Sequence, residues 1–229
     1  MATYFITGTD TDAGKTLVTA GLLALARRQG LTTLGLKPVA SGCHLYTEGL
    51  RNDDALALQA RSHPEVDYAT INPFAYAPAI APHLAARQAG DTLHLATLTE
   101  AMAEALALKR DLTLIEGAGG WRVPLNDNED LSDLAGALQL PVILVVGMQL
   151  GCINHARLTA EAIRAQGLRL AGWVANSITT DFDEADDNLA SLAHHLSAPC
   201  LGRVPHLTDG PNDTLPEQAG RHLKLPDLP

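Results

Sequence analysis

The chain has 229 residues, and 16 basic against 26 acidic residues give it a formal net charge of −10 at pH 7. This length fits one α/β domain, and the acidic balance argues against a nucleic-acid partner, whose phosphates would be repelled. Three well-separated cysteines without a Cys-x-x-Cys pair, an N-terminus without a basic leader and the lack of a long apolar run predict a cytoplasmic protein without disulfides, zinc ribbon or membrane span.

Short apolar runs alternate with helical patterns along the chain. The expected strands are 4–7, 33–36, 112–115, 142–146, 170–175 and 200–204. The expected helices are 16–28, 54–60 (capped by Asn52 or Asp53), 95–108, 156–165 and 185–196. We expect residues 73–82 to form an irregular loop and the proline-rich tail from about residue 207 to be loop laid over the domain. The alternation predicts a single α/β domain with a mostly parallel sheet and helices on both faces.

The most specific local signal is the segment from Gly8 to Thr16, which follows a strand and opens a helix. Its glycines let backbone N–H groups face phosphate oxygens, and the helix start adds its positive dipole end. Lys15 would supply charge to the outer phosphates, and Thr16 a hydroxyl to Mg²⁺. The spacing is one residue longer than Gly-x4-Gly-Lys-Ser/Thr, which disfavours an ordinary kinase or GTPase. The segment predicts a P-loop NTPase-like fold.

Two acidic residues lie where they can reach a metal beside this loop. Glu116 ends a predicted buried strand and is followed by three glycines within four residues, and Asp54 lies at a loop-to-helix turn. Mg²⁺ prefers such hard oxygen ligands. The alternative for Asp54 is simple helix capping, a role for which Asp53 competes.

Lys37 is one of only four lysines in the chain, and it falls at the carboxyl end of a predicted strand. Ligands of open α/β sheets bind at that edge. Pro38 fixes the chain that leaves the strand, and Ser41 with Gly42 forms a polar turn. We therefore predict a second anion-binding corner here and expect the fold itself not to depend on the Lys37 side chain. The alternative is a solvated lysine.

In order and register over roughly residues 3–206, these motifs resemble the dethiobiotin synthetase family. The matching segments are Gly8-Thr9-Asp10-Thr11, Gly14-Lys15-Thr16, Lys37-Pro38-Val39, Ser41-Gly42, Asn52-x-Asp54-Ala55, Glu116-Gly117-Ala118-Gly119-Gly120, Pro124-Leu125, Leu150-Gly151-Cys152-Ile153-Asn154-His155 and Gly172-Trp173-Val174-Ala175-Asn176. The resemblance implies that 7,8-diaminononanoate, CO₂ and ATP react with Mg²⁺ present. A carbamate of one amine would be phosphorylated and then attacked by the second amine, which closes a cyclic urea in biotin biosynthesis.

The resemblance also implies residue roles. Lys15, Lys37 and Thr11 would be catalytic, and Thr16, Asp54 and Glu116 would bind the metal. Nucleotide contacts would come from Asp12, Ala13, Gly14, Lys15, Thr16, Leu17, Asp54, Glu116, Gly117, Ala118, Gly119, Asn176, Ser177, Pro205, His206, Leu207 and Asn212. Substrate contacts would come from Thr11, Ser41, Gly117, Gly119, Leu150, Gly151, Cys152, Ile153 and Asn154. The chain departs from the family pattern at Asp12, where glutamate is common, and at Ser177, where aspartate is common.

The segment from Leu150 to Asn154 opens a predicted helix, whose first N–H groups lack intrahelical partners. From the residues alone it could be a solvated helix start capped by Asn154. The resemblance implies instead that it reaches the substrate carboxylate across the two-fold axis of a homodimer, so that each active site is shared.

Two other functions share the expected fold. Switching ATPases of the cell-division and partitioning type typically carry a lysine after the first loop glycine, where this chain has Thr9, and the sequence ends without a basic amphipathic helix. Another amidoligase or carboxylase is the third possibility. The scattered histidines (His83, His94, His194, His195, His206 and His222) have no metal-ligand spacing, and we expect structural or solvated roles for them.

Overall fold

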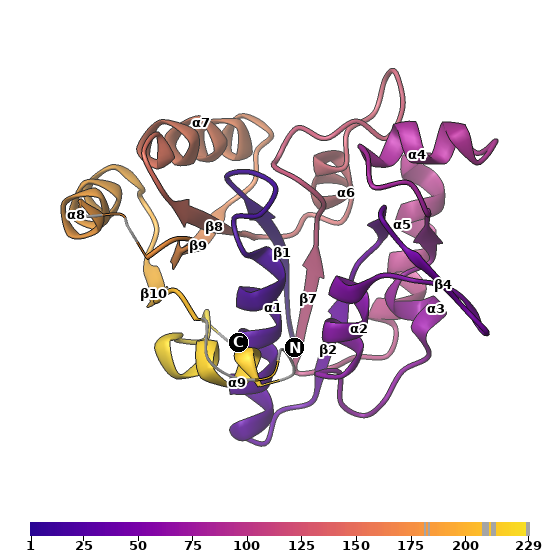
Figure 1. Cartoon of the computed structure of the whole chain (residues 1–229), viewed down its shortest axis with the longest axis horizontal. Helices are drawn as coiled ribbons and strands as arrows, with labels where there is room; N and C mark the ends of the chain where they lie inside the picture. Colours follow the sequence, from indigo (N-terminus) through magenta and orange to yellow (C-terminus); the bar gives the residue numbers. More distant parts are fainter. Residues whose placement is uncertain (181, 183, 208–210, 212–213, 228–229) are drawn as a thin grey trace.

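The computed structural model describes residues 1–180, 182, 184–207, 211 and 214–227. Within these residues, six parallel strands form a central sheet in the order β10-β9-β8-β1-β7-β2 (Figure 1). The strands are β1 (Ala2–Gly8), β2 (Thr33–Leu36), β7 (Leu112–Glu116), β8 (Val142–Met148), β9 (Leu170–Ser177) and β10 (Cys200–Val204). Because all six run the same way, their carboxyl ends meet at one edge, which is where the sequence placed the site.

Helices connect and cover these strands. They are α1 (Lys15–Arg28), α2 (Asp53–Gln59), α3 (Tyr68–Ile71), α4 (Pro82–Gln88), α5 (Leu95–Leu106), α6 (Ser132–Ala137), α7 (Cys152–Ala165), α8 (Ala185–His195), α9 (Leu215–Ala219) and the 3₁₀ turn η1 (Gly220–His222). Helix α1 packs on β1, β2 and β7, whereas α7 packs on β8 and β9. None of the helices in the described parts of the chain is long and apolar enough to cross a membrane.

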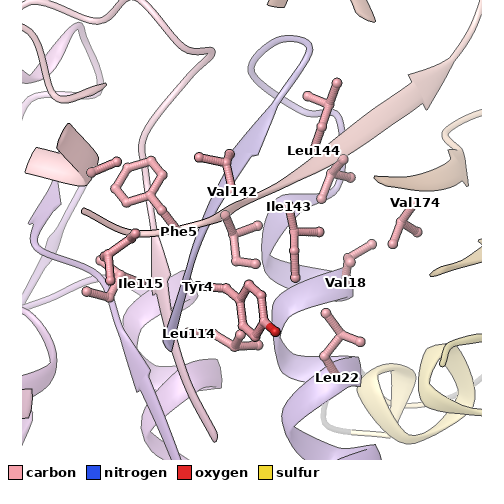
Figure 2. Packing of buried hydrophobic residues seen from close by; sticks show 14 of the residues in the cluster. Tyr4, Phe5, Val18, Leu22, Leu114, Ile115, Val142, Ile143, Leu144 and Val174 are labelled. Atoms are coloured by element: carbon pink, nitrogen blue, oxygen red, sulfur yellow. The ribbon is translucent and has the colours of Figure 1, made fainter. Parts of the chain in front are cut away.

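The core is mostly aliphatic, as the low aromatic content predicts. Every residue of β8 is buried, and Val18 and Leu22 of α1 are fully buried near Tyr4 and Leu114 of the sheet (Figure 2). Full burial of one such aliphatic side chain stabilises the fold by about 1.5–3 kcal/mol. The strand ends that carry the site are therefore anchored in a closely packed interior.

Two small sheets lie beyond the main sheet on the side of β2. Strand β3 (Val39–Ala40) pairs with β6 (Phe74–Ala75), and β4 (His44–Tyr46) pairs with β5 (Gly49–Arg51) as a hairpin. Residues 73–82 were expected to be irregular throughout, but they contain β6 and end where α4 begins. The hydrogen bonds of Tyr76 N–H to Ala40 O and of Cys43 N–H to Tyr76 O continue this pairing.

The tail differs from the expected loop. Helix α9 and η1 pack against α1. Ala219 and Leu223 can approach α1 closely at Gly21, because Gly21 has no side chain. Pro216 lies in the first turn of α9, where the N–H that proline lacks has no intrahelical partner in any case. A proline that starts a helix is easily taken for one that breaks it.

Candidate active site

The phosphate loop joins β1 to α1. Gly14 is the N-cap of α1 with φ +86°, and a Cβ placed there would lie 2.0 Å from Asn176 Nδ2. Only glycine meets both the backbone and the space requirement. Among the described residues no side chain caps α1, and its first turn holds no acidic residue. The free N–H groups of this turn therefore form an anion site.

Lys15 is buried beside the loop. Its Nζ donates to Asp10 O at 2.9 Å, and its side chain is folded back along the loop. Burial and the neighbouring Lys37 lower the pKa of Lys15, although Glu116 and Asp54 oppose this. An anionic ligand such as a phosphate would favour the charged form of this lysine.

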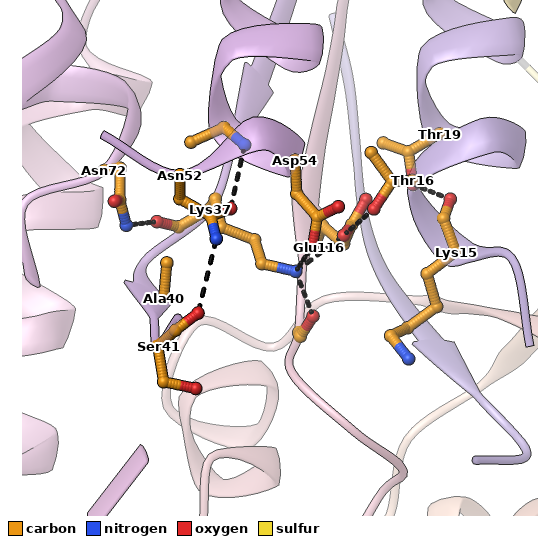
Figure 3. Close-up of polar contacts among 12 residues, drawn as sticks. Lys15, Thr16, Thr19, Lys37, Ala40, Ser41, Asn52, Asp54, Asn72 and Glu116 are labelled. Carbon is orange, nitrogen blue, oxygen red and sulfur yellow. Dashed lines mark hydrogen bonds and ion pairs between the residues drawn. The ribbon is translucent and has the colours of Figure 1, made fainter. Parts of the chain in front are cut away.

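Lys37 lies at the centre of the polar cluster (Figure 3). Its Nζ is 2.7 Å from Glu116 Oε1, 3.1 Å from Asp54 Oδ2 and 3.1 Å from Gly117 O, so each of its three N–H groups has an acceptor. Burial alone would lower the pKa of Lys37, but Glu116 and Asp54 raise it above its usual value. The ammonium is therefore charged and fixed in direction.

This arrangement bears on two expectations for Lys37. The side chain is 5% exposed, so it is not a solvated strand-end lysine. The structure also gives a physical argument against the expectation that the fold does not depend on this side chain, because Glu116 is fully buried and Lys37 neutralises its charge. Removing one partner of a buried ion pair leaves an uncompensated charge.

The three proposed metal ligands lie together. Thr16 Oγ1 donates to Glu116 Oε1 at 2.8 Å, and Lys37 bridges Glu116 to Asp54. Burial would raise the pKa of Asp54, but Lys37 and a hydrogen bond from Thr16 lower it. Glu116 Oε2 is buried and has no hydrogen-bond partner in the described structure. Two carboxylates, a hydroxyl and an unused buried oxygen fit a hard cation such as Mg²⁺.

The structure also settles the cap of α2. Asn52 Oδ1 accepts from Ala55 N–H at 3.2 Å, so Asn52 is the cap and neither Asp53 nor Asp54 is needed for it. The side chain of Asp54 is 43% exposed and faces the cleft. The capping alternative for Asp54 does not hold.

Most of these groups line a cleft of about 820 Å³. Glu116, which is fully buried, and the predicted site residues Ala13 and Gly117 are not among its lining residues. The expected site residues in its lining are Thr11, Asp12, Gly14, Lys15, Thr16, Leu17, Lys37, Ser41, Asp54, Ala118 and Gly119. The sequence analysis missed Ala40, Asn52, Gly120, Val123 and the run Ala79-Ile80-Ala81-Pro82. The sequence did contain a signal for this run, because the run lies in the expected proline-rich loop. Loops at the rim of a rigid sheet often carry binding residues.

Asn176 contacts the back of the phosphate loop. Its Nδ2 donates to Ala13 O at 3.0 Å, and its Oδ1 is buried without a hydrogen-bond partner in the described residues. Ser177 ends β9 in register with Met148. Residues 205–207 follow the adjacent strand β10, and Asn212 lies outside the described residues. The described members of this set lie outside the cleft lining, on the side of the sheet that carries β9 and β10.

The segment from Leu150 to Asn154 does not line the cleft of its own chain in the described structure. Gly151, with φ +93°, is the N-cap of α7, so Asn154 lies within the first turn and is not the cap that the residues alone allowed. Leu150 is 92% exposed, and Cys152 is buried. No side chain caps this helix start among the described residues, and the N–H of Cys152 donates to Gln149 O at 3.0 Å.

Comparison with known proteins identifies the family. A family model described as an AAA domain matches residues 2–213. The chain is 67% identical to the ATP-dependent dethiobiotin synthetase BioD of Chromohalobacter salexigens, with 99% of each chain covered. It is 58% identical to the enzyme of the same description from Pseudomonas aeruginosa, covering 100% of this chain and 98% of the relative. The chain belongs to the dethiobiotin synthetase family. ATP-dependent dethiobiotin synthesis, the function of this family, is therefore the function of the chain.

Solved structures confirm the fold of this dethiobiotin synthetase. The MinC:MinD cell division complex of Aquifex aeolicus matches with a TM-score of 0.60 and 16% identity, covering 96% of this chain and 86% of that chain. A ParA family ATPase from Chlorobium tepidum matches with a TM-score of 0.54 and 11% identity, covering 97% and 90%. At such identities the likeness shows the P-loop fold alone. The relatives that match this chain over nearly their full length are dethiobiotin synthetases. Their much higher identity decides against the switching-ATPase alternative.

Proposed function

We propose that the chain uses ATP and Mg²⁺ to join CO₂ to 7,8-diaminononanoate and close the ring of dethiobiotin, releasing ADP and phosphate. The observation that supports this proposal best is that the phosphate loop and the fixed ammonium of Lys37 line the same cleft. A site with two cations, free helix N–H groups and two carboxylates suits transfer of a phosphoryl group between two anions.

The proposed reaction has three steps: carbamate formation, phosphorylation and ring closure. One amine of the substrate forms a bond to the carbon of CO₂ and loses a proton, which gives a carbamate. A carbamate oxygen then takes the γ-phosphoryl group from ATP, and ADP leaves. The second amine attacks the carbonyl carbon of this mixed anhydride and loses a proton, phosphate leaves, and the urea ring is closed. Each step needs reacting groups held close together and their negative charge offset.

The residues of the cleft divide these tasks. Lys15 lies along the phosphate loop, where it would offset charge on the γ-phosphate, and Lys37 would stabilise the carbamate oxygens and the transferred group. Thr11 and Ser41, which both line the cleft, would orient the carbamate and the diamine. Because Lys37 donates to Glu116, Asp54 and Gly117 O, it keeps one direction while the substrate anions change.

Thr16, Asp54 and Glu116 would hold Mg²⁺, which supplies charge neutralisation for the phosphates when bound. On the other side, Asn176 and Ser177, with Pro205, His206, Leu207 and Asn212, would contact the base of the nucleotide. The buried and unused Oδ1 of Asn176 supports this assignment, because it can accept a hydrogen bond from the adenine amino group.

We also propose a homodimer with shared active sites. The helix start at Leu150 to Asn154 is turned away from its own cleft, and the almost fully exposed Leu150 is an apolar side chain that a second subunit would cover. The positive dipole end of α7, which no side chain caps in the described structure, would favour the substrate carboxylate by about 0.3–1 kcal/mol, and by up to about 2 kcal/mol when partly buried.

The proposed reaction predicts coupled hydrolysis. Phosphate release from ATP should depend on diamine, bicarbonate and Mg²⁺ together, because the acceptor of the phosphoryl group is the carbamate. A phosphate-release assay that omits one component at a time, with mass-spectrometric detection of dethiobiotin, measures this. Rapid ATP hydrolysis that is unchanged by adding diamine would refute the ligase reaction.

The metal assignment predicts that Glu116→Gln and Asp54→Asn raise the Mg²⁺ concentration needed for half-maximal rate, since each removes an anionic oxygen. Diamine binding measured without nucleotide should fall less. Asp53→Asn is a matched control, because Asp53 lies next to Asp54 but does not line the cleft. Mg²⁺ dependence identical to that of the unmodified protein would show that neither carboxylate is a ligand.

A further inference from the structure

Three polar residues, Asn52, Tyr68 and Asn72, form a hydrogen-bonded network beside Lys37 and Ser41, in which Asn52 takes part through both its main-chain N–H and its side chain. The hydroxyl of Tyr68 accepts from Asn52 N–H at 2.8 Å and donates to Asn72 Oδ1 at 3.0 Å. Asn72 Nδ2 donates to Lys37 O at 2.7 Å and to Phe74 O at 3.3 Å. Asn52 and Asn72 are 9% and 3% exposed, and Figure 3 shows them on either side of the Lys37 backbone.

The two ends of this hydrogen-bonded network reach the functional residues. The main chain of Lys37 is held on both sides, because its N–H donates to Ile71 O at 2.8 Å and its carbonyl accepts from Asn72. Asn52 Nδ2 donates to Ser41 O at 3.3 Å, and Asn52 Oδ1 caps the helix that carries Asp54. Lys37, Ser41 and Asp54 lie on three different segments. The same hydrogen-bonded network contacts all three segments.

The direction of every bond in the network is determined. Asn72 Nδ2 faces two carbonyls and its Oδ1 faces a hydroxyl, so the amide has one consistent orientation. The Tyr68 ring is itself fixed, since the Arg51 guanidinium lies 4.3 Å from its centroid. A network of this kind, in which the two asparagines are buried and Tyr68 is partly buried, favours one arrangement, because an alternative would leave the buried amide groups unpaired.

We propose that Asn52, Tyr68 and Asn72 are positioning residues for the reaction, which set the distance between the Lys37 ammonium, Ser41 and the metal-binding Asp54. Tyr68 and Asn72 do not line the cleft, so they act through the main chain of Lys37 and Ser41. The proposal rests on the proposed function. It assigns a catalytic effect to a tyrosine hydroxyl that touches neither substrate nor nucleotide.

Tyr68→Phe tests the proposal, because it removes the hydroxyl that joins the two asparagines and keeps the ring beside Arg51. We expect kcat to fall about tenfold or more, since small displacements of positioned groups are costly. The dissociation constant of a non-hydrolysable ATP analogue, measured by calorimetry, should be unchanged, because the phosphate loop is not part of the network. Tyr4→Phe is the matched control: Tyr4 OH donates to the main-chain carbonyl of Asp227, also interacts with Arg169, and does not line the cleft.

Both variants should lose a similar, small amount of thermal stability, but Tyr4→Phe should keep full kcat. Asn72→Ala should lower kcat further, and Tyr68→Phe combined with Asn72→Ala should cost less than the product of the two single effects. All rates are compared well below the unfolding midpoints. Equal kcat for Tyr68→Phe, Tyr4→Phe and the unmodified protein would overturn the positioning role. An unmodified protein that makes no dethiobiotin would overturn the proposed function instead.

Discussion

Replacing Lys37 with alanine should lower kcat by about 10²–10³, because one fixed cation is lost from the site where negative charge develops. The free energy of unfolding should also fall, by about 3 kcal/mol when measured without Mg²⁺, since Glu116 is then left buried and unpaired. Steady-state kinetics and chemical denaturation measure the two effects. The protein is expected to need Lys37 for both stability and turnover.

A second substitution separates the two roles. In Lys37→Ala combined with Glu116→Gln, the buried negative charge is gone, so much of the lost stability should return while turnover stays low. Lys224→Ala is the control for removing a lysine charge, because Lys224 is exposed and only its main-chain N–H has a described bond, to Leu201 O. Near-normal turnover of Lys37→Ala would remove Lys37 from the mechanism.

Placing glutamate at Gly151 should raise the KM for the diamine about tenfold or more and leave ATP binding intact, if the helix start of one subunit meets the substrate carboxylate in the other. The added charge opposes that carboxylate. Gly151 has φ +93°, so any side chain there is strained. Gly151→Gln carries the same strain and size without the charge, and the difference between the two variants isolates the electrostatic effect.

Mixing the two defective proteins tests whether sites are shared. A dimer of one Lys37→Ala subunit and one Gly151→Glu subunit has one site with both residues intact and one with neither. Random exchange of subunits should therefore restore about one quarter of the unmodified activity from two nearly inactive parents. Failure of the mixture to gain activity, or full activity in a strictly monomeric protein, would refute the shared site.

The sequence predicted the main sheet well because its signals are local. Strand β2 has the predicted bounds, and the apolar, β-branched run of β8 was correctly placed. The strand-to-helix context of the phosphate loop is equally local, and the loop lies at the predicted edge of the sheet. These features depend on neighbours within a few residues, which a single sequence displays directly.

The missed features depend on contacts between distant residues. Lys37 was recognised as a candidate, but its pairing with Glu116, 79 residues away, could not be derived from either residue alone. The link from Asn52 through Tyr68 to Asn72 is of the same kind. Asn52 and Asp53 were equally good caps by residue type, and only the backbone geometry decided between them. The motifs predicted candidate site residues, whereas the packing of the fold determines which side chains those candidates contact.

The contact between the two ends of the chain has a consequence for synthesis on the ribosome. Helix α1 follows the phosphate loop, and its Gly21 face is covered by Ala219 and Leu223, while Tyr4 of β1 donates to the carbonyl of Asp227. Strand β1 and helix α1 are therefore not fully covered until the residues from Ala219 to Asp227 have been translated. Such pairing of distant segments slows folding and leaves apolar surface open to association in the interval. The nascent protein has its phosphate-loop sequence early but completes the packing around α1 only when these residues are available.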